Sequence, residues 1–251
     1  MAASIRHTGG VFWSLFLIQL ANWRWSWPAT VINGLLVPVT AMFFLKSVSG
    51  DSNHLNDTFI ICGNIVVSLI FTTMYGTSAR FSFMRTFGVL DYYATLPVPK
   101  VFLVLAVNAG FLVLTLPTAL LTIVLGQVFF GLNLIFNPLF FLIVPLASFS
   151  LSAVGAFVGV SAVNFDTSNT ITGILQFVLL GFSNVLVPEE RAPVFMNVIG
   201  HFLPSTYAAD ALRRSLTNSF GSAFWLDIGF LLIFDLAAMV FVARKMEWRR
   251  A

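Results

Sequence analysis

A long uncharged stretch decides what kind of protein this chain can form. Residues 101–165 contain no Asp, Glu, Lys, Arg or His. One spanning helix needs about 20 apolar residues, so this stretch is long enough for two, divided at 126–138 where Gly, Asn and Pro cluster. Only 9% of all residues are charged and 58% are hydrophobic, which leaves too few polar groups to cover a soluble domain. The sequence therefore predicts an all-α membrane protein.

Four further segments, at 25–45, 58–79, 169–187 and 223–243, bring the expected number of transmembrane helices to six. An even number places both termini on one side of the membrane. If that side is cytoplasmic, it holds most of the 13 basic residues, namely Arg6, Arg24, Arg80, Arg85, Lys100, Arg244, Lys245, Arg249 and Arg250. The remaining four are Lys46, Arg191, Arg213 and Arg214. We expect a multi-pass protein of the plasma (inner) membrane with cytoplasmic termini.

The N-terminal segment, residues 1–25, is expected to lie in the membrane interface rather than to cross it. On a helix over 11–25, Ser14, Gln19 and Asn22 share one arc, and Phe, Trp and Leu residues occupy the rest. The aromatic residues at 23–27 are typical of an interface, and no cleavage site of a signal peptide follows. Gly9 and Gly10 are expected to form a flexible joint ahead of this helix.

Residues 188–214 are expected to form an external hairpin between spans five and six. The run PEERAPVFMNVIGHFLP contains an amphipathic helix of about 15 Å, half of the ~30 Å that the bilayer core requires. After Pro204, the run STYAADALRRSL predicts a second short helix, in which Asp210 can pair with Arg213 or Arg214. The two helices fit a re-entrant hairpin shielded by protein, although a solvated external helix remains an alternative.

A second polar segment, residues 80–100, lies between spans two and three. Its sequence RFSFMRTFGVLDYYATLPVPK fits a short helix that is exposed to a cytoplasmic partner and carries Arg80, Arg85, Asp91 and the pair Tyr92 and Tyr93. Pro97 would end that helix before span three. The alternative is an interfacial loop whose arginines meet lipid phosphates.

Several kinds of chemistry are missing from the sequence. The three histidines are far apart and there is a single cysteine, so no metal site is expected. Neither a Gly-x-Ser-x-Gly motif nor a phosphate-binding Gly-Lys-Ser/Thr loop occurs, so we expect no enzyme and no cofactor in this chain. Any ATP and Mg²⁺ would be bound by a separate subunit. Nucleic acid is not an expected partner, because the basic residues are scattered at membrane boundaries.

Asp235 is an acid inside the predicted sixth span. An acid at such a position can drive a secondary transporter or channel, and buried acids in membranes are usually functional. It can also pair with a Ser, Thr or Asn of a neighbouring helix, which is the interpretation we prefer.

Residues 179–216 resemble the membrane subunit of ABC type-2 exporters, of the drug-resistance kind. That family ends its fifth span in Gly-Phe, continues through a Pro-containing external hairpin, and follows it with Pro-x-Thr-Tyr-x-x-Asp-x-x-Arg. The matching residues are Gly181, Phe182, Pro188, Pro204, Thr206, Tyr207, Asp210 and Arg213. The loop at 80–100 resembles the family's coupling helix at Gly88, Leu90, Thr95, Pro97 and Val98, although Asp91 replaces a Glu and Leu96 is inserted.

The resemblance implies that residues 1–251 form one membrane domain, a half-transporter in the lipid bilayer that pairs with a second copy or a homologous permease and with an ABC ATPase subunit. It implies coupling to that ATPase through Arg80, Arg85, Gly88, Leu90, Asp91, Tyr92 and Pro97. It implies an external gate at Pro188, Pro204, Thr206, Tyr207, Asp210 and Arg213. The expected substrate is an amphipathic drug-like or lipid-like compound, with a polysaccharide or lipid-linked glycan as the alternative.

Overall fold

The computed structural model describes residues 2–24, 27–49, 54–96, 98–130, 138–189 and 192–246. Every regular element in these ranges is a helix. The elements are α1 (Ala2–Trp23), α2 (Trp27–Ser49), α3 (His54–Leu69), the π-helix η1 (Ile70–Met74), α4 (Tyr75–Thr86), α5 (Val89–Thr95), α6 (Lys100–Phe130), α7 (Phe140–Ser161), α8 (Phe165–Gly181), α9 (Val194–Gly200), α10 (Pro204–Leu216) and α11 (Ser222–Lys245).

Five of the described helices are long and apolar enough to cross a membrane. These are α2, the continuous helix α3–η1–α4, α6, α7 and α11. The remaining expected span, the fifth along the chain, corresponds to α8, which has 17 residues and covers 165–181 rather than the predicted 169–187. The predicted all-α membrane fold with about six spans is therefore confirmed, with shifted ends for the fifth span.

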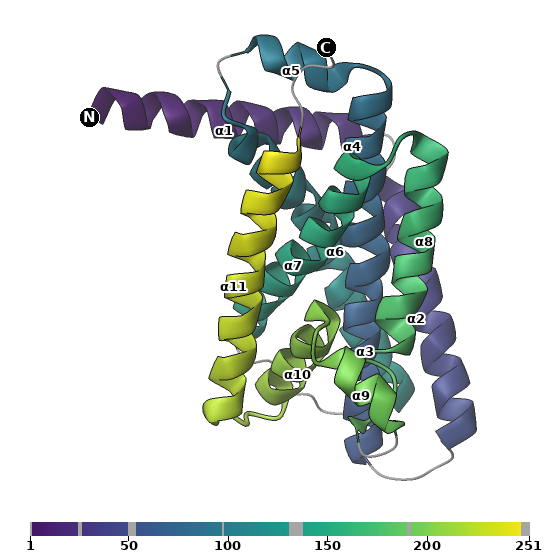
Figure 1. Ribbon diagram of the computed structural model, residues 1–251. Coiled ribbons are helices and arrows are strands. Elements are labelled where there is room, and N and C mark those ends of the chain that lie inside the picture. The colour runs from purple at the N-terminus through teal and green to yellow at the C-terminus, as the bar shows by residue number, and fades with distance from the viewer. Residues whose placement is uncertain are drawn as a thin grey trace.

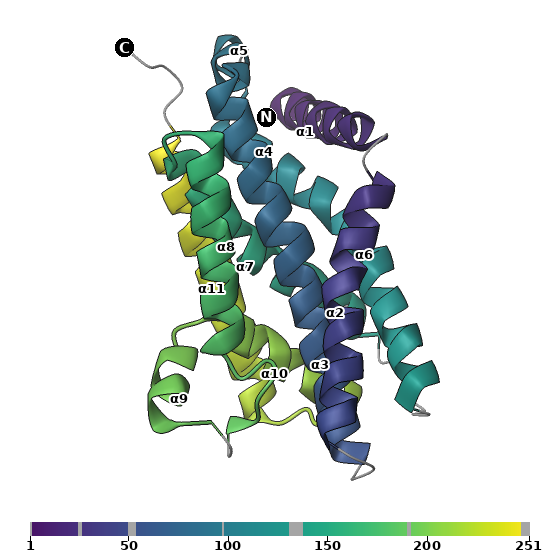
Figure 2. The ribbon, with the colours of Figure 1, turned by 90° about the vertical axis from the view of Figure 1, so that its right-hand side faces the viewer.

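Short helices lie at both ends of the bundle formed by these spans. Helix α1 lies across one end, beside α5, and α9 and α10 lie at the opposite end (Figures 1 and 2). We call these the α5 end and the α10 end. The last turn of α11 reaches the α5 end, where the Lys100 Nζ atom donates to the Met246 carbonyl oxygen at 2.6 Å. Helix α1 runs through Gly9 and Gly10 without a break, so the expected flexible joint there is wrong.

The continuous helix α3–η1–α4 is the most buried span and forms the centre of the bundle. Helix α7 packs closely against it because Gly155 and Gly159 lie one turn apart at the contact. A Cβ atom at Gly155 would come within 2.1 Å of the Met74 carbonyl oxygen, and one at Gly159 within 2.4 Å of the Ser78 carbonyl oxygen. Small residues at this spacing let two membrane helices approach to backbone contact.

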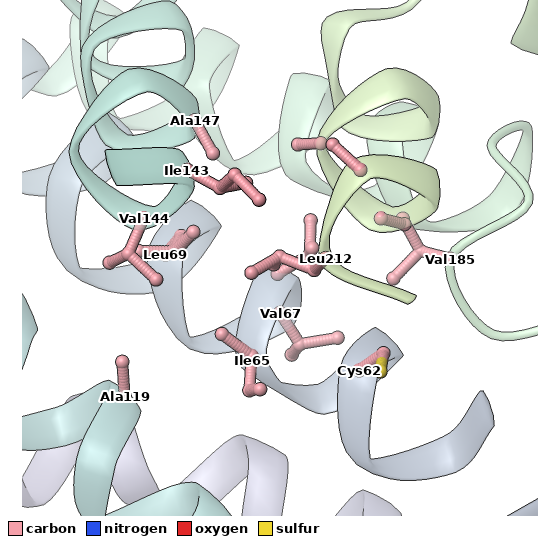
Figure 3. Close-up of a cluster of buried hydrophobic side chains, with 14 of the residues drawn as sticks. Cys62, Ile65, Val67, Leu69, Ala119, Ile143, Val144, Ala147, Val185 and Leu212 are labelled. Atoms are coloured by element: carbon pink, nitrogen blue, oxygen red, sulfur yellow. The ribbon is translucent and has the colours of Figure 1, made fainter. Parts of the chain in front are cut away.

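Two clusters of buried apolar side chains hold α1, α5 and α10 to the bundle. The cluster nearer the α10 end joins α3, α7 and α10, and includes Cys62, Leu69, Ile143 and Leu212 (Figure 3). The second lies at the α5 end and contains Leu15 of α1, Leu90 of α5 and neighbours from α4, α6, α7 and α11. Both α1 and α10 are thus packed parts of the fold.

Candidate functional site: a cavity between four helices

The described residues line a cavity of about 800 Å³ beside the central helix, open on one side. Its walls come from the end of α1, from α2, from η1 and α4, and from α8. From Phe71 to Phe83 the lining follows the central helix for about 18 Å, starting near the middle of the bundle and ending at the α5 end. The lining residues are Asn22, Trp23, Thr30, Asn33, Leu36, Val37, Phe71, Thr72, Tyr75, Gly76, Ala79, Arg80, Phe83, Phe165 and Gln176.

The lining combines aromatic rings with a few polar groups, as pockets for small molecules do. Part of the wall is η1, where Phe71 and Thr72 face the cavity. Gln176 of α8 donates from its Nε2 atom to the Ile70 carbonyl oxygen at 3.4 Å, which joins α8 to this irregular turn. Wide turns of this kind inside α-helices often occur at functional sites.

Hydroxyl groups fix α8 against α4 beside the cavity. The Ser78 Oγ atom lies 2.7 Å from the Thr172 Oγ1 atom and 3.0 Å from the Ser168 Oγ atom. All three side chains are buried. These bonds satisfy polar groups that would otherwise be costly in a membrane interior, and they hold α8, which forms part of the cavity wall, against α4.

Among the described lining residues, Arg80 is the one that carries a charge. Its position differs from the short exposed helix on which the sequence analysis placed it. Helix α4 continues to Thr86, so Arg80 belongs to the second span and not to a short exposed helix. Its Nε atom donates to the Gln19 Oε1 atom of α1 at 3.1 Å, and its guanidinium carbon lies 6.0 Å from the centre of the Phe83 ring. The prediction that placed Arg80 on a short exposed helix is therefore wrong.

Arg85 also turns inward. Its Nη1 atom donates to the carbonyl oxygens of Val160 at 2.5 Å and Ala162 at 2.6 Å. These carbonyls belong to the last turn and the C-cap of α7, where backbone acceptors lack intrahelical partners and a basic residue is favoured. Arg85 thus caps α7, and the prediction that placed it on an exposed helix is wrong.

The rest of the predicted coupling segment does form a short helix, α5. Gly88 has a φ of +71°, a left-handed conformation that reverses the chain between α4 and α5 at little cost for glycine. Leu90 and Tyr93 lie on the inner side of α5 and are buried, so the expected exposure of Tyr93 is wrong. Burial raises the pKa of Tyr93. Asp91 and Tyr92 are exposed on its outer side. Pro97 lies outside the described residues, and the coupling role of this segment stays a prediction.

The segment at 188–214 forms two helices as expected, but only one of them is shielded by the rest of the protein. Helix α10 is the shielded one, with nine buried residues among them Pro204 and Thr206. Helix α9 instead exposes an apolar surface formed by Val194, Phe195 and Val198, and Phe202 just beyond its end is exposed too. The half-length helix that the sequence indicated therefore lies at the edge of the molecule, while the second helix inserts into the bundle (Figure 2).

Arg213 fastens α10 to the chain that follows α8. Its Nη1 atom donates to the Asp210 Oδ1 atom at 2.7 Å, which confirms the predicted pair. Its Nη2 atom donates to the carbonyl oxygens of Asn184 at 2.5 Å and Val185 at 2.9 Å. The guanidinium carbon lies 3.6 Å from the centre of the Phe59 ring on α3. One side chain thus joins α3, α10 and the segment at 184–185.

The other predicted gate residues lie around α10. The Tyr207 hydroxyl donates to the His201 carbonyl oxygen at 2.8 Å, and its ring stacks on Phe230 of α11 with centres 3.8 Å apart. The Pro188 carbonyl accepts from the Ala192 amide at 3.1 Å. Arg214 pairs with Asp227 of α11 rather than with Asp210. The gating role of these residues stays a prediction.

Asp235 of α11 has a partner of the expected kind. Its Oδ1 atom accepts a hydrogen bond from the Ser150 Oγ atom of α7 at 2.6 Å. No group of three or more His, Cys, Asp or Glu residues able to hold a metal ion occurs in the described chain.

Comparisons with known proteins agree with this architecture. Residues 10–217 match the family model described as ABC-2 type transporter. A curated relative from Streptomyces coeruleorubidus, named daunorubicin resistance ABC transporter permease protein DrrB1, is 30% identical over 221 residues, which covers 82% of this chain and 74% of the relative. The matched region contains the whole cavity, α5, α9 and α10. The chain belongs to the ABC-2 type transporter family.

Proposed function

We propose that this chain is the transmembrane subunit of an ATP-driven exporter that moves an amphipathic, drug-like or lipid-like compound out of the cytoplasm. The observation that carries the proposal is the cavity beside α4, whose volume of about 800 Å³ suits a drug-sized molecule. Its mixed aromatic and polar lining suits a compound that is partly apolar. The name of the Streptomyces relative supports a substrate of the drug kind, whereas a glycan would favour a longer, more polar channel.

The functional unit in this proposal contains two permease copies. The cavity is bordered by α2 and α8, which lie on the flank of the bundle opposite α11 (Figure 1). A second copy placed against this flank would close the cavity into a shared pathway. Helix α10 and its Arg213 contacts would then form the outer gate of that pathway, at the opposite end from α5.

An ABC ATPase subunit would bind at the α5 end and supply ATP hydrolysis. Helix α5 offers the exposed Asp91 and Tyr92 to such a partner, while buried Leu90 holds it to the bundle. A bulky or charge-reversing change should disturb this docking, so we expect Gly88→Trp and Asp91→Arg to lose the co-purified ATPase. Tyr207→Ala at the α10 end should retain it. Equal ATPase recovery with all three variants would contradict this assignment.

Transport in inside-out vesicles that contain this permease and its ATPase tests the whole proposal. Accumulation of a fluorescent amphiphile should require ATP and should persist when a protonophore removes the proton gradient. Leu36→Trp fills the cavity from α2 and should reduce accumulation, whereas Ile233→Trp, at an exposed position of α11 outside the cavity lining, should not. Uptake that follows the proton gradient and ignores ATP would refute the proposal.

A further inference from the structure

We infer that the cavity selects amphipathic anions, and that the anionic group of the substrate binds at Arg80 while its apolar body extends along α2 and α4 toward the middle of the bundle. This inference rests on the proposed export function and specifies the substrate class of the same cavity. It depends on the charge, position and partners of the lining residues.

The charge of the cavity is one-sided. Arg80 contributes a permanent positive charge, and no Asp or Glu occurs among the described lining residues. Both ion pairs in the described part of the chain lie at the α10 end, between Arg213 and Asp210 and between Arg214 and Asp227. No described carboxylate therefore lies within 4.0 Å of the Arg80 guanidinium. The positive charge of Arg80 therefore attracts an anionic substrate into the cavity and repels a cationic one.

The cost of placing an unpaired guanidinium in a membrane span argues that it serves a purpose there. Charged residues inside spans are expensive and commonly mark substrate pathways. The Arg80 bond to Gln19 is a bond to a neutral amide and uses one of the five N–H donors of the guanidinium. A carboxylate or phosphate can accept two parallel bonds from such a group, and these are among the strongest hydrogen bonds in proteins.

The remaining lining gives the expected substrate its shape and direction. Leu36, Val37 and Phe71 lie further from the α5 end than Arg80 and form an apolar section. From Arg80 to Phe71 the central helix rises about 13 Å, enough for a fused aromatic ring system or a short chain. The Phe83 ring near Arg80 can stack on a planar body. The fitting compound has one acidic group at the end of an apolar or aromatic body of drug size.

Three probes that share one apolar body can test the inference directly. Pyrenebutyrate is anionic, pyrenebutanol is neutral and pyrenebutylamine is cationic. Binding to the purified permease in phosphatidylcholine nanodiscs can be followed by energy transfer from tryptophan to pyrene, with empty nanodiscs subtracted. The six tryptophans include Trp23 in the lining, so Trp23→Phe should remove much of the signal from the cavity. We expect the anion to bind at least tenfold more tightly than the amine.

Variants of Arg80 separate its charge from its contact with α1. Arg80→Gln should weaken pyrenebutyrate binding about tenfold and leave pyrenebutanol unchanged, while Arg80→Lys should retain most of the preference. Gln19→Met removes the bond between α1 and Arg80 but keeps the charge, so it should retain the preference too. Arg24→Gln is the matched control, because Arg24 is an exposed arginine at the same end and is not a lining residue.

The outcomes of this experiment separate the inference about anions from the proposed export function. Tighter binding of the amine, or an anion preference that survives in Arg80→Gln, overturns the inference while leaving the export function intact. Failure of all three probes to bind also overturns the inference, and the vesicle assay with and without ATP then decides the export function separately. Adding phosphatidylglycerol to the nanodiscs identifies the source of the anion: loss of the pyrenebutyrate signal indicates a bilayer lipid, and its persistence indicates a soluble amphiphile.

Discussion

Arg213 is expected to contribute more than any other single side chain to holding α10 and the segment at 184–185 together, in the region proposed as the outer gate, and Arg213→Met tests this. Methionine keeps a long apolar side chain over Phe59 but removes every hydrogen-bond donor. The carbonyl oxygens of Asn184 and Val185 and the Asp210 carboxylate then lose their common partner. The segment at 184–185 should separate from α3 and α10 more often.

The size of the effect follows from the bonds that are lost. The Arg213 side chain is 14% exposed, so its bonds to the two carbonyl oxygens are shielded from water. A hydrogen bond to a charged group contributes about 1.5–3 kcal/mol, and breaking a buried pair by removing one partner costs about 3–5 kcal/mol. Because every 1.4 kcal/mol is a factor of ten, a cost of about 3–5 kcal/mol should make local opening roughly 10² to 4 × 10³ times more frequent.

Cys62 is a built-in reporter for this opening. It is the single cysteine of the chain, it is fully buried, and it lies in the cluster that also contains Val185 (Figure 3). The Val185 backbone covers α3 at this point, since a Cβ atom at the neighbouring Gly63 would lie 2.2 Å from the Val185 oxygen. The labelling rate of Cys62 with N-ethylmaleimide, measured on purified protein, should therefore rise with the opening frequency.

Two variants make the result specific. Asp210→Asn breaks the ion pair but leaves the two carbonyl bonds, so labelling should rise about tenfold at most. Arg214→Met removes a neighbouring arginine that pairs with Asp227 and not with 184–185, so its effect on Cys62 should be smaller than that of Arg213→Met. If Arg213→Met stays folded and labels within threefold of the wild-type rate, Arg213 does not hold this segment.

Two further expectations concern Asp235 and the orientation of the chain. Asp235→Asn keeps a partner for Ser150 and removes the charge, so ATP-driven export and assembly should survive; loss of a proton-coupled uptake instead would support a secondary transporter. An impermeant thiol reagent applied to intact cells should label Ser52→Cys and not Thr86→Cys, in a background with Cys62 replaced by Ala. Labelling of Thr86→Cys alone would invert the orientation predicted from the basic residues.

The uncharged runs predicted the number and location of the spans well, because a chain that crosses a bilayer core in helical form must present apolar residues to it. The ends were less predictable. The second span was expected to end before Arg80, yet α4 continues to Thr86, because Gln19 and the α7 carbonyls accept hydrogen bonds from Arg80 and Arg85. Whether a charged residue can lie inside a span depends on such distant partners, which a linear sequence does not reveal.

The cavity was not predicted, because its lining comes from α1, α2, η1–α4 and α8, which are far apart along the chain. Some signal was present: Asn33 and Gln176 are strongly polar residues within predicted spans. A protein-shielded hairpin was predicted at 188–214, but which of its two helices would be buried was not. That choice depends on Arg213 reaching the backbone at 184–185, a contact across 28 and 29 residues of sequence.

The π-helix η1 has a consequence for how sequences of this family are aligned. A single wide turn accommodates about one more residue than an α-turn, so it inserts a residue without disturbing the helix on either side. A related chain with a regular α-helix here would be one residue shorter between 70 and 74 and would still direct its equivalent of Arg80 into the cavity. An ungapped alignment would place that equivalent one position away, which corresponds to a rotation of about 100° on the helix. Comparisons of substrate preference among relatives must therefore allow a one-residue gap at η1.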